Sequence, residues 1–389
     1  MRKGDSWNES HVRLDRTTGR TIRYLTGNGD INYKAPYHTR TTFTEDGRYL
    51  VVSTFRDGYS ALLRADASTG DLVCLTDPVL GDELSITPGT VTPLSGWHYY
   101  WEGEALRGVN VYSLEEKVII ENIGREWSGA LLSVNREESL LATPVTTTHP
   151  EVLAGRPAGG HVSYEEAFPG GEGLETKILE VELESNSVTE IFREARVKCA
   201  HLEYSPVDSD LVYLDRDLSP LWWAGGDRSR TSRCHILRRS TSELTPLTPA
   251  AEAKFQIHAV WSWDGQFILY HGPAVLTDGP CPWYIGVVRP SGEIYREWIF
   301  DHGRHYGHVA AAPDRPAIII DGNTTESELQ WLYYDGEVPR FESIGTHATE
   351  WGSLPGQMSH PHPSTDSAGR FVAYNVAAGG RSDVCLIEI

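Results

Sequence analysis

Short apolar runs recur along the chain, and each follows a turn of small and polar residues. The clearest turns contain Asp46-Gly47, Asp264-Gly265 and Ser367-Ala368-Gly369, and a run rich in Leu, Val, Ile, Phe and Tyr follows each of them. Such turns followed by β-branched and aromatic residues are typical of antiparallel strands joined by a tight hairpin. The full pattern spans 43–52, 261–270 and 364–374, with looser copies at 93–100, 135–141, 205–213 and 312–320.

A second hairpin alternates with the first along the chain. It is clearest in 14–22 and 65–73, and looser versions lie at 111–120, 181–191, 237–247, 288–298 and 333–341. Two hairpins in each repeat of about fifty residues make a four-stranded antiparallel sheet, the blade of a β-propeller. We therefore predict an all-β fold in which 1–389 form a single seven-bladed β-propeller domain.

The two ends of the chain and one long gap between turns refine this prediction. The last strand, 385–389, leaves its blade one strand short, whereas the segment 10–26 begins with a hairpin that has no first half. Because an open sheet edge is a template for aggregation, we expect the N-terminal strand to complete the last blade and close the ring. The Gly- and Pro-rich stretch 150–173 is expected to be an insertion, a loop over one face.

Two stacked β-sandwich domains are the alternative fold, since they also have short strands at regular spacing. The repeats run on without a linker-like change of composition, and this favours one closed propeller. The hydrophobic content of 40% suffices for a large core.

The formal net charge of −20 at pH 7 limits the partners that the chain can attract. It argues against nucleic acid and against an anionic membrane surface. It also opposes an anionic substrate, which would need a local cluster of arginine, histidine or metal. The five cysteines are widely spaced without a Cys-x-x-Cys motif, and the N-terminus lacks an apolar signal segment. We therefore expect a soluble, cytoplasmic protein with reduced thiols; its oligomeric state stays open.

The segment Gln357-Met358-Ser359-His360-Pro361-His362-Pro363 carries the clearest candidate chemistry. On an extended strand successive side chains alternate between faces, so His360 and His362 would project to the same side. The proline after each histidine stiffens the backbone. Two imidazoles on one face predict a metal site.

Histidines also recur at one position of the repeat. Because the innermost strand of each blade lines the central channel, residues in this register are expected to form a ring at one channel mouth. A single such histidine is more often a core residue bonded to backbone, but four in register favour a site. They are His258, His308 and His360, six before Asp264, Asp314 and Asp366, and His201, seven before Asp208; Arg40 lies six before Asp46, with His38 nearby.

These positions predict a ligand set of three imidazoles and one amide oxygen. His308, Gln357, His360 and His362 lack a thiolate, and nitrogen with a hard oxygen suits Mn, Fe, Co or Ni better than a closed structural zinc site. His258 and His201, on preceding blades, are candidates for neutral acid–base groups.

The segment 357–363, followed by a hairpin, resembles the QxxHPHP signature of the oligogalacturonate lyases, polysaccharide lyase family 22. The resemblance extends in spacing to Gly307-His308, Ile257-His258 and Ala200-His201. It implies a seven-bladed propeller with Mn²⁺ bound by His308, Gln357, His360 and His362, although another divalent transition metal is possible. It also implies His258 as the base and, by spacing, Arg233 as a catalytic cation, whereas the insertion 150–173 has no counterpart.

The implied reaction is β-elimination of short oligogalacturonides, 4-linked uronate oligosaccharides, to 4,5-unsaturated uronate products in pectin degradation. A base removes the C5 proton, negative charge grows on the C6 carboxylate, and the C4 oxygen leaves. A metal, Arg233 and Arg40 would stabilise that charge, and Arg40 with His38 would contact the anionic substrate.

Two other functions compete with this hypothesis. A lyase for a different uronic-acid oligosaccharide would use the same metal and base. A non-catalytic propeller of the TolB or WD type would instead bind partner proteins through exposed loops, and its histidines would be incidental. The propeller of a serine peptidase is excluded because the sequence contains no GxSxG motif.

Overall fold

The computed structural model of the chain describes residues 1–34, 42–81, 89–154, 163–217, 232–248, 254–274, 282–300, 307–322, 327–354 and 356–389. Within these residues the strands form seven antiparallel sheets, each containing at least four strands. The predicted all-β fold, a seven-bladed β-propeller, is confirmed. No helix in the described ranges is long and apolar enough to cross a membrane.

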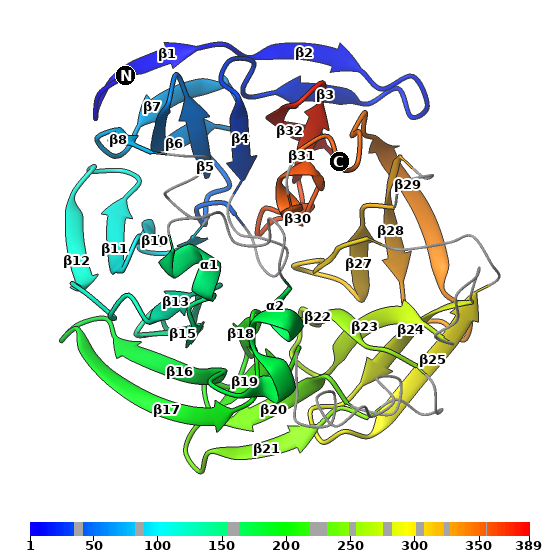
Figure 1. Cartoon of the computed structure of the whole chain (residues 1–389). Helices are drawn as coiled ribbons and strands as arrows, with labels where there is room; N and C mark the ends of the chain where they lie inside the picture. The colour runs from blue at the N-terminus through cyan, green and yellow to red at the C-terminus, as the bar shows by residue number, and fades with distance from the viewer. Residues whose placement is uncertain are drawn as a thin grey trace. The chain divides into compact units, whose positions relative to one another are not determined.

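The chain divides into two compact units, and the first comprises Met1–Gly103, Arg107–Val118 and Arg304–Ile389. Apart from short parts of β11 and β12, it holds four blades (Figure 1). Blade 1 is β1 (Ser6–Asn8), β4 (Ile31–Lys34), β5 (Tyr49–Arg56), β6 (Tyr59–Asp66), β7 (Asp71–Cys74) and β8 (Val79–Leu80); blade 2 is β9 (Thr90–Val91), β10 (Trp97–Glu102), β11 (Ala105–Asn110) and β12 (Glu116–Ile120). Blade 6 is β26 (Val309–Ala311), β27 (Ala317–Ile320), β28 (Glu328–Tyr333) and β29 (Arg340–Thr346); blade 7 is β2 (His11–Leu14), β3 (Thr21–Tyr24), β30 (Ser364–Thr365), β31 (Phe371–Ala378) and β32 (Arg381–Glu388).

The second unit comprises Glu104–Leu106 and Ile119–Gly303 and holds three blades. Blade 3 is β13 (Trp127–Gly129), β14 (Ser133–Val134), β15 (Leu140–Thr147), β16 (Glu175–Glu182) and β17 (Ser187–Ala195); blade 4 is β18 (Leu202–Tyr204), β19 (Leu211–Asp215), β20 (Cys234–Arg238) and β21 (Glu243–Pro246). Blade 5 is β22 (Ile257–Trp261), β23 (Ile268–Pro273), β24 (Trp283–Val288) and β25 (Ile294–Phe300). Whether all seven blades fold as one domain stays a prediction.

Local sequence explains the hairpins and the cores between sheets. The glycines of the three clearest turns, Gly47, Gly265 and Gly369, have φ of 67°, 67° and 65°, the left-handed region that a side chain would oppose. The strands after these turns carry apolar side chains on both faces, and β5 is buried along most of its length. Packing on both faces is the reason, since Leu50 and Val52 contact residues of blade 7, whereas Val51 faces blade 2.

The N-terminal segment completes the last blade, as predicted. Strand β3 pairs with β32 in antiparallel register, with Ile22 opposite Ile387 and Tyr24 opposite Cys385, and β2 pairs with β3 beyond it. Figure 1 shows these blue N-terminal strands beside the red C-terminal ones. Strand β1 additionally pairs with β7, so the N-terminus covers the outer edges of two blades.

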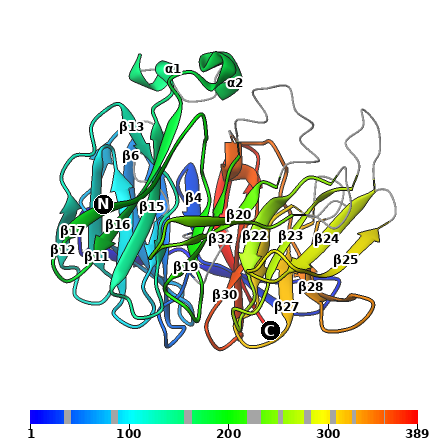
Figure 2. The same cartoon turned by 90° about the horizontal axis from the view of Figure 1, so that it is seen from below.

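The insertion 150–173 contains short helices rather than only a loop. Helix α1 (Pro150–Leu153), helix α2 (Tyr164–Ala167) and the 3₁₀ turn η1 (Pro169–Gly171) connect β15 to β16. Ser163 caps α2 in a capping box with Glu166, which satisfies backbone N–H groups that the helix leaves open. In Figure 2 both helices stand beyond the ends of the strands of blade 3.

Candidate metal and acid–base sites

Three histidine side chains gather in the first unit. One ring nitrogen of each of His308, His360 and His362 lies within 4.8 Å of the others. His308 directly precedes β26, and the other two lie between the 3₁₀ turn η3 (Gly356–Ser359) and β30. Blades 6 and 7, which share a hydrophobic core, therefore bring together residues that are 52 and 54 positions apart in the chain.

Backbone hydrogen bonds correct the predicted register of the histidines. In these four blades the residue that opens the first turn donates its backbone N–H to a carbonyl five or six positions later, at or just before the start of the next strand. Counting back four positions from that donor places His362, not His360, in register with His201, His258 and His308. The donors are Ser205, Ser262, Ala312 and Asp366. Asp366 opens its turn, whereas Asp264 and Asp314 lie two positions inside theirs, so counting from the aspartates misaligned blade 7.

Gln357 adds an oxygen to the cluster. It lies in η3, and its Oε1 is 3.2 Å from Nε2 of His362. The tight turn brings the amide back onto the histidine five residues later. All four predicted ligands therefore lie together, with His308 and His362 buried and His360 half-buried.

Two further residues, Asp321 and Tyr33, contact the Nδ1 atoms of His308 and His362. Asp321, fully buried just after β27, contacts Nδ1 of His308 at 3.2 Å and accepts hydrogen bonds from the backbone N–H groups of His308 and His362 at 2.6 and 3.2 Å. The hydroxyl of Tyr33 in β4 hydrogen-bonds Nδ1 of His362. Metal-binding histidines commonly use one nitrogen in this way and offer the other to the metal. The arrangement leaves Nε2 of both rings as the ligand atom.

The third histidine has the features of an unsatisfied ligand. Nδ1 of His360 is buried and has no hydrogen-bond partner among the residues that the structure describes. Burial, together with the neighbouring His308, lowers the pKa of His360 to about 4, so the ring is neutral, as metal ligation requires. Trp351 packs against it with ring centroids 4.7 Å apart. A neutral imidazole whose buried Nδ1 has no hydrogen-bond partner among the described residues, beside two oriented imidazoles and an amide oxygen, fits a divalent transition metal.

Sequence reasoning did not identify Asp321 or Tyr33. A signal for Asp321 was present, because an aspartate directly follows an apolar run in both 211–215 and 317–321. Both aspartates occupy the same position of the repeat, opposite the histidine of the register. Tyr33 carried no comparable signal, since its partner His362 is 329 residues away.

A second cluster forms in the second unit around the other buried aspartate. Asp215, at the end of β19, contacts Nδ1 of His201 through Oδ2 at 2.5 Å, and Arg233 donates from Nη2 to the same oxygen at 3.0 Å. Its Oδ1 accepts from the backbone N–H groups of Ala200 and His201. Burial would raise the pKa of Asp215, but His201, Arg233 and these N–H groups outweigh it and hold that pKa well below its usual value. Asp215 is therefore an ionised carboxylate.

Arg233 is a buried cation shared between two carboxylates. Besides Asp215 it contacts Asp217 Oδ1 at 3.0 Å, and it lies over the ring of Phe255. Its Nε has no hydrogen-bond partner within the described part of the chain. Arg233 and His201, both predicted as catalytic residues, therefore contact the same carboxylate, that of Asp215.

His258 belongs to the same cluster but has different partners. It sits at a β-bulge of β22 with φ of 47°, an unusual backbone conformation that redirects its side chain. Its ring centroid is 6.4 Å from that of His201, and its Nδ1 is 3.3 Å from Nε2 of His271 in β23. His271 in turn accepts at Nδ1 from the indole N–H of Trp283, at 3.0 Å. His362 in the first unit shares the left-handed backbone, with φ of 46°.

The predicted substrate contacts Arg40 and His38 lie outside the described residues. Their roles stay predictions.

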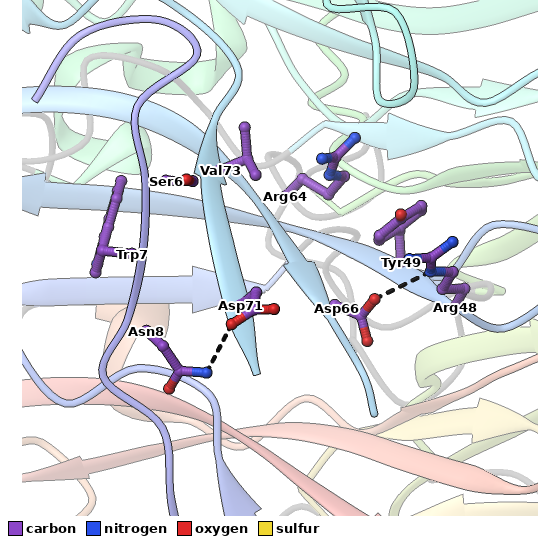
Figure 3. A pocket seen from close by; sticks show the side chains of 9 residues that line it. All are labelled: Ser6, Trp7, Asn8, Arg48, Tyr49, Arg64, Asp66, Asp71 and Val73. Carbon is purple, nitrogen blue, oxygen red and sulfur yellow. Dashed lines mark hydrogen bonds and ion pairs between the residues drawn. The ribbon is translucent and has the colours of Figure 1, made fainter. Parts of the chain in front are cut away.

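A pocket of about 440 Å³ lies elsewhere in the first unit, on blade 1. Figure 3 shows its lining from β1, β5, β6 and β7, with dashed lines from Arg48 to Asp66 and from Asn8 to Asp71. Arg64, which also lines it, donates to the carbonyl of Val111. These charged groups are hydrogen-bonded to neighbouring side chains or to backbone, and none of the predicted site residues lines the pocket. The candidate chemistry therefore lies in the two histidine clusters.

Comparison with solved structures shows the same fold in oligogalacturonate lyases. An oligogalacturonate lyase in complex with manganese superposes with a TM-score of 0.80 at 19% identity, covering 100% of this chain and 98% of the other. An oligogalacturonate lyase from Vibrio parahaemolyticus gives 0.76 at 18% identity, with the same coverage. A chain of a mitotic checkpoint complex gives 0.55 at 12% identity, covering 94% and 96%. No protein-family model and no curated protein sequence matches the chain.

Proposed function

We propose that the protein is a metal-dependent lyase that cleaves short oligogalacturonides by β-elimination and releases 4,5-unsaturated uronate products. The observation that carries this proposal is the set of three imidazoles and one amide oxygen in the first unit. The fold shared with an oligogalacturonate lyase in complex with manganese supports it. The substrate would be a small anionic oligosaccharide, with neither nucleic acid nor membrane as partner.

His308, His360, His362 and Gln357 would hold Mn²⁺ or another divalent transition metal. When bound, such a metal supplies positive charge that stabilises a carboxylate as negative charge develops on it. Asp321 and Tyr33 would orient His308 and His362 toward the ion. All four ligands are neutral, so the ion would keep most of its charge for the anionic substrate, which the net charge of −20 otherwise repels.

The second cluster would carry out the proton transfer. An uncharged imidazole, His258 or His201, would take the C5 proton, because only a neutral ring has a lone pair for it. Arg233 would stabilise negative charge on the uronate carboxylate, as would Arg40, with His38 as a further substrate contact.

The reaction is proposed for the cytoplasm. The four described cysteines, Cys74, Cys199, Cys234 and Cys385, are unbonded and buried thiols, which is typical of a reducing compartment.

The test combines elemental analysis of the purified protein with ultraviolet absorbance after mixing with digalacturonate and Mn²⁺. We expect a bound transition metal and rising absorbance from the unsaturated product. His308→Ala and His360→Ala should each lose the metal while circular dichroism stays that of the folded protein. His11→Ala is the matched control, since His11 is an exposed histidine of β2.

Other outcomes select the competing functions. Metal without absorbance would retain the metal site and point to a lyase for another uronic-acid oligosaccharide. Neither metal nor absorbance would favour a propeller that only binds partner proteins. Metal retained by both variants would overturn the ligand assignment.

A further inference from the structure

The pocket on blade 1 lies where this sheet is wider than its neighbour. Blade 1 is five strands wide in the order β1-β7-β6-β5-β4, whereas blade 2 has four strands. The inner part of the face toward blade 2 is packed, since Val51 and Leu62 share a hydrophobic cluster with Val111. The outer part, on β7 and β1, lines the pocket of about 440 Å³ (Figure 3). Small-molecule sites typically measure roughly 300–1,000 Å³, so the pocket is large enough for a ligand.

Strand register places the lining side chains on one face of the sheet. Arg64 of β6 is opposite Val73 of β7, and Val73 is opposite Ser6 of β1. Tyr49 of β5 is opposite Asp66, which follows Arg64 by two positions on β6. Cross-strand partners point to the same face, and so do residues two apart on one strand. The floor of the pocket is therefore the sheet itself.

Two guanidinium groups meet at the ring of Tyr49. The guanidinium carbons of Arg48 and Arg64 lie 4.6 and 4.5 Å from its centroid. Arg48 donates from Nε to Oδ2 of Asp66 at 3.0 Å, so its two Nη groups stay available to another acceptor. The other oxygen of that carboxylate accepts backbone N–H groups of its own turn. Asp66 therefore neutralises one of the two cations at most.

Arg64 is a cation without a counter-ion in the part of the chain that the structure describes. Its Nη1 donates to the carbonyl oxygen of Val111 at 2.6 Å. Nε and Nη2 keep their N–H donors, in the planar arrangement that matches a carboxylate. The chain has 54 acidic and only 34 basic residues, yet this half-buried guanidinium stands beside a second one and pairs with none of those acids. The geometry favours an anionic ligand.

The pocket also offers groups that suit hydroxyls. Asp71 accepts from Asn8 through Oδ1 at 2.8 Å, whereas its Oδ2 has no hydrogen-bond partner among the described residues. An ionised carboxylate can only accept, so the matching ligand group is a donor. Ser6 adds a hydroxyl that can donate or accept, and Val73 adds an apolar contact suited to the C–H groups of a sugar ring. A ligand with one carboxylate and several hydroxyls satisfies all of these groups.

We propose that this pocket binds a sugar acid, with the carboxylate on Arg64 and Arg48 and a ring hydroxyl on Asp71. The site is separate from both histidine clusters, and no histidine lines it. It goes beyond the proposed elimination, because it would hold a uronate without cleaving it. Such a site retains an anionic saccharide at a protein whose net charge of −20 otherwise repels it.

Isothermal titration calorimetry of the full-length protein with D-galacturonate tests the proposal. A monosaccharide has no glycosidic bond to cleave, so binding is measured without turnover. We expect saturable binding that persists in EDTA, because the pocket needs no metal. D-galactose, which lacks the carboxylate, should bind at least about tenfold more weakly, the effect of losing one charge-assisted hydrogen bond. Binding that disappears in EDTA, or no binding at all, overturns the proposal.

Variants locate the bound sugar acid. Arg64→Ala should weaken galacturonate binding by about 10–100-fold, and Asp71→Ala, at an exposed position, should also weaken it; circular dichroism verifies folding. Arg13→Ala is the matched control, since Arg13 is an exposed arginine of β2 whose guanidinium lies 4.9 Å from the ring centroid of Tyr24, outside the pocket. Wild-type affinity in both pocket variants overturns the proposal.

Competing ligands test the chemical class. Acetate, inorganic phosphate and glycine each carry an anionic group without the sugar hydroxyls, and each should bind more weakly than galacturonate. Equal affinity for acetate or phosphate would identify a general anion site, and equal affinity for glycine an amino-acid site; either result overturns the sugar-acid assignment. Galacturonate binding in a protein that forms no unsaturated product from digalacturonate would overturn the proposed lyase and leave this pocket assignment intact. Product formation without binding at the pocket would overturn the pocket assignment alone.

Discussion

Two buried aspartates perform the same task at the scale of single residues. In blade 4 and in blade 6, one carboxylate oxygen accepts the backbone N–H of a histidine and the other contacts Nδ1 of the same ring. The ring is thereby fixed with its lone pair on Nε2. In the proposed function His201 belongs to the acid–base cluster and His308 binds the metal. The two roles differ because His308 lies beside His360 and His362, whereas His201 lies beside Arg233 and His258.

Replacing Asp321 tests this orienting role at the metal cluster. Asp321→Asn should weaken Mn²⁺ binding by about 10–100-fold, the usual effect of removing a partner that orients a metal-bound histidine. Isothermal titration calorimetry would measure the dissociation constant, with circular dichroism to verify folding. Asp314→Asn, an exposed position in the first turn of the same blade, is the control. Equal affinity in the two variants would mean that Asp321 does not orient the ligands.

At the scale of elements, the N-terminal hairpin β2–β3 is secured by its pairing with β32 and by one turn residue. Asp15 is 3% exposed and accepts from the backbone N–H and hydroxyl of Thr346, at the end of β29, at 2.9 and 3.0 Å. It also accepts hydrogen bonds from Thr17 and Thr18 within its own turn. The hairpin is thus tied to blade 6 as well as to the blade that it completes.

Removing this link should destabilise the protein measurably. Asp15→Ala leaves a backbone N–H of Thr346 without its acceptor, and we expect a loss of about 2–3 kcal/mol in the free energy of unfolding, measured by urea denaturation. Asp335→Ala, in the exposed connection between β28 and β29, should change it by less than about 0.5 kcal/mol.

The effect of Asp15 should also depend on pH. The pKa of Asp15 lies below its ordinary 3.8 because its hydrogen bonds to Thr17, Thr18 and Thr346 outweigh the effect of burial. The folded state therefore favours the ionised form, and the stabilisation is present above pH 3.8 and lost as the pH falls through the lower folded-state pKa. A gap between wild type and Asp15→Ala that widened on acidification would contradict this assignment.

At the scale of the whole molecule, the cluster of His308, His360 and His362 is a candidate site for a divalent cation in a chain whose net charge is −20. A ligand that binds only the folded state stabilises it in proportion to the logarithm of its concentration over the dissociation constant. The candidate metal cluster lies in the first unit and the candidate acid–base cluster in the second. Thermal unfolding with and without Mn²⁺ therefore measures how much metal binding stabilises the folded chain.

Thermal unfolding provides that measurement. At Mn²⁺ concentrations of about 100 times the dissociation constant, wild-type protein should gain about 2.7 kcal/mol and a higher Tm in differential scanning calorimetry. His308→Ala should show little of this gain, and His11→Ala should show all of it. A similar rise in the Tm of His308→Ala would mean that Mn²⁺ acts elsewhere on this acidic chain.

Particular residues mark how far sequence reasoning reached into the site. The segment 357–363 indicated three ligands, and the repeat indicated His308, because proline-flanked histidines and turn-anchored strands are local features. The same reasoning placed His360 rather than His362 in register, since an aspartate can stand at different positions of a hairpin turn. It also named His258 as the base, and that role stays a prediction; its contacts with His271, and of His271 with Trp283, come from neighbouring strands that no local pattern pairs.

The sequence by itself determined the seven antiparallel sheets, the completion of the last blade by the N-terminus and the chemical types at the site. These follow from alternation, turn glycines and repeat length, which act over a few residues. Only the tertiary structure decided which nitrogen each histidine presents. Asp321 is 13 residues from His308, and Tyr33 is 329 residues from His362. Such partners meet only when strands pair and blades pack, so no local pattern encodes them.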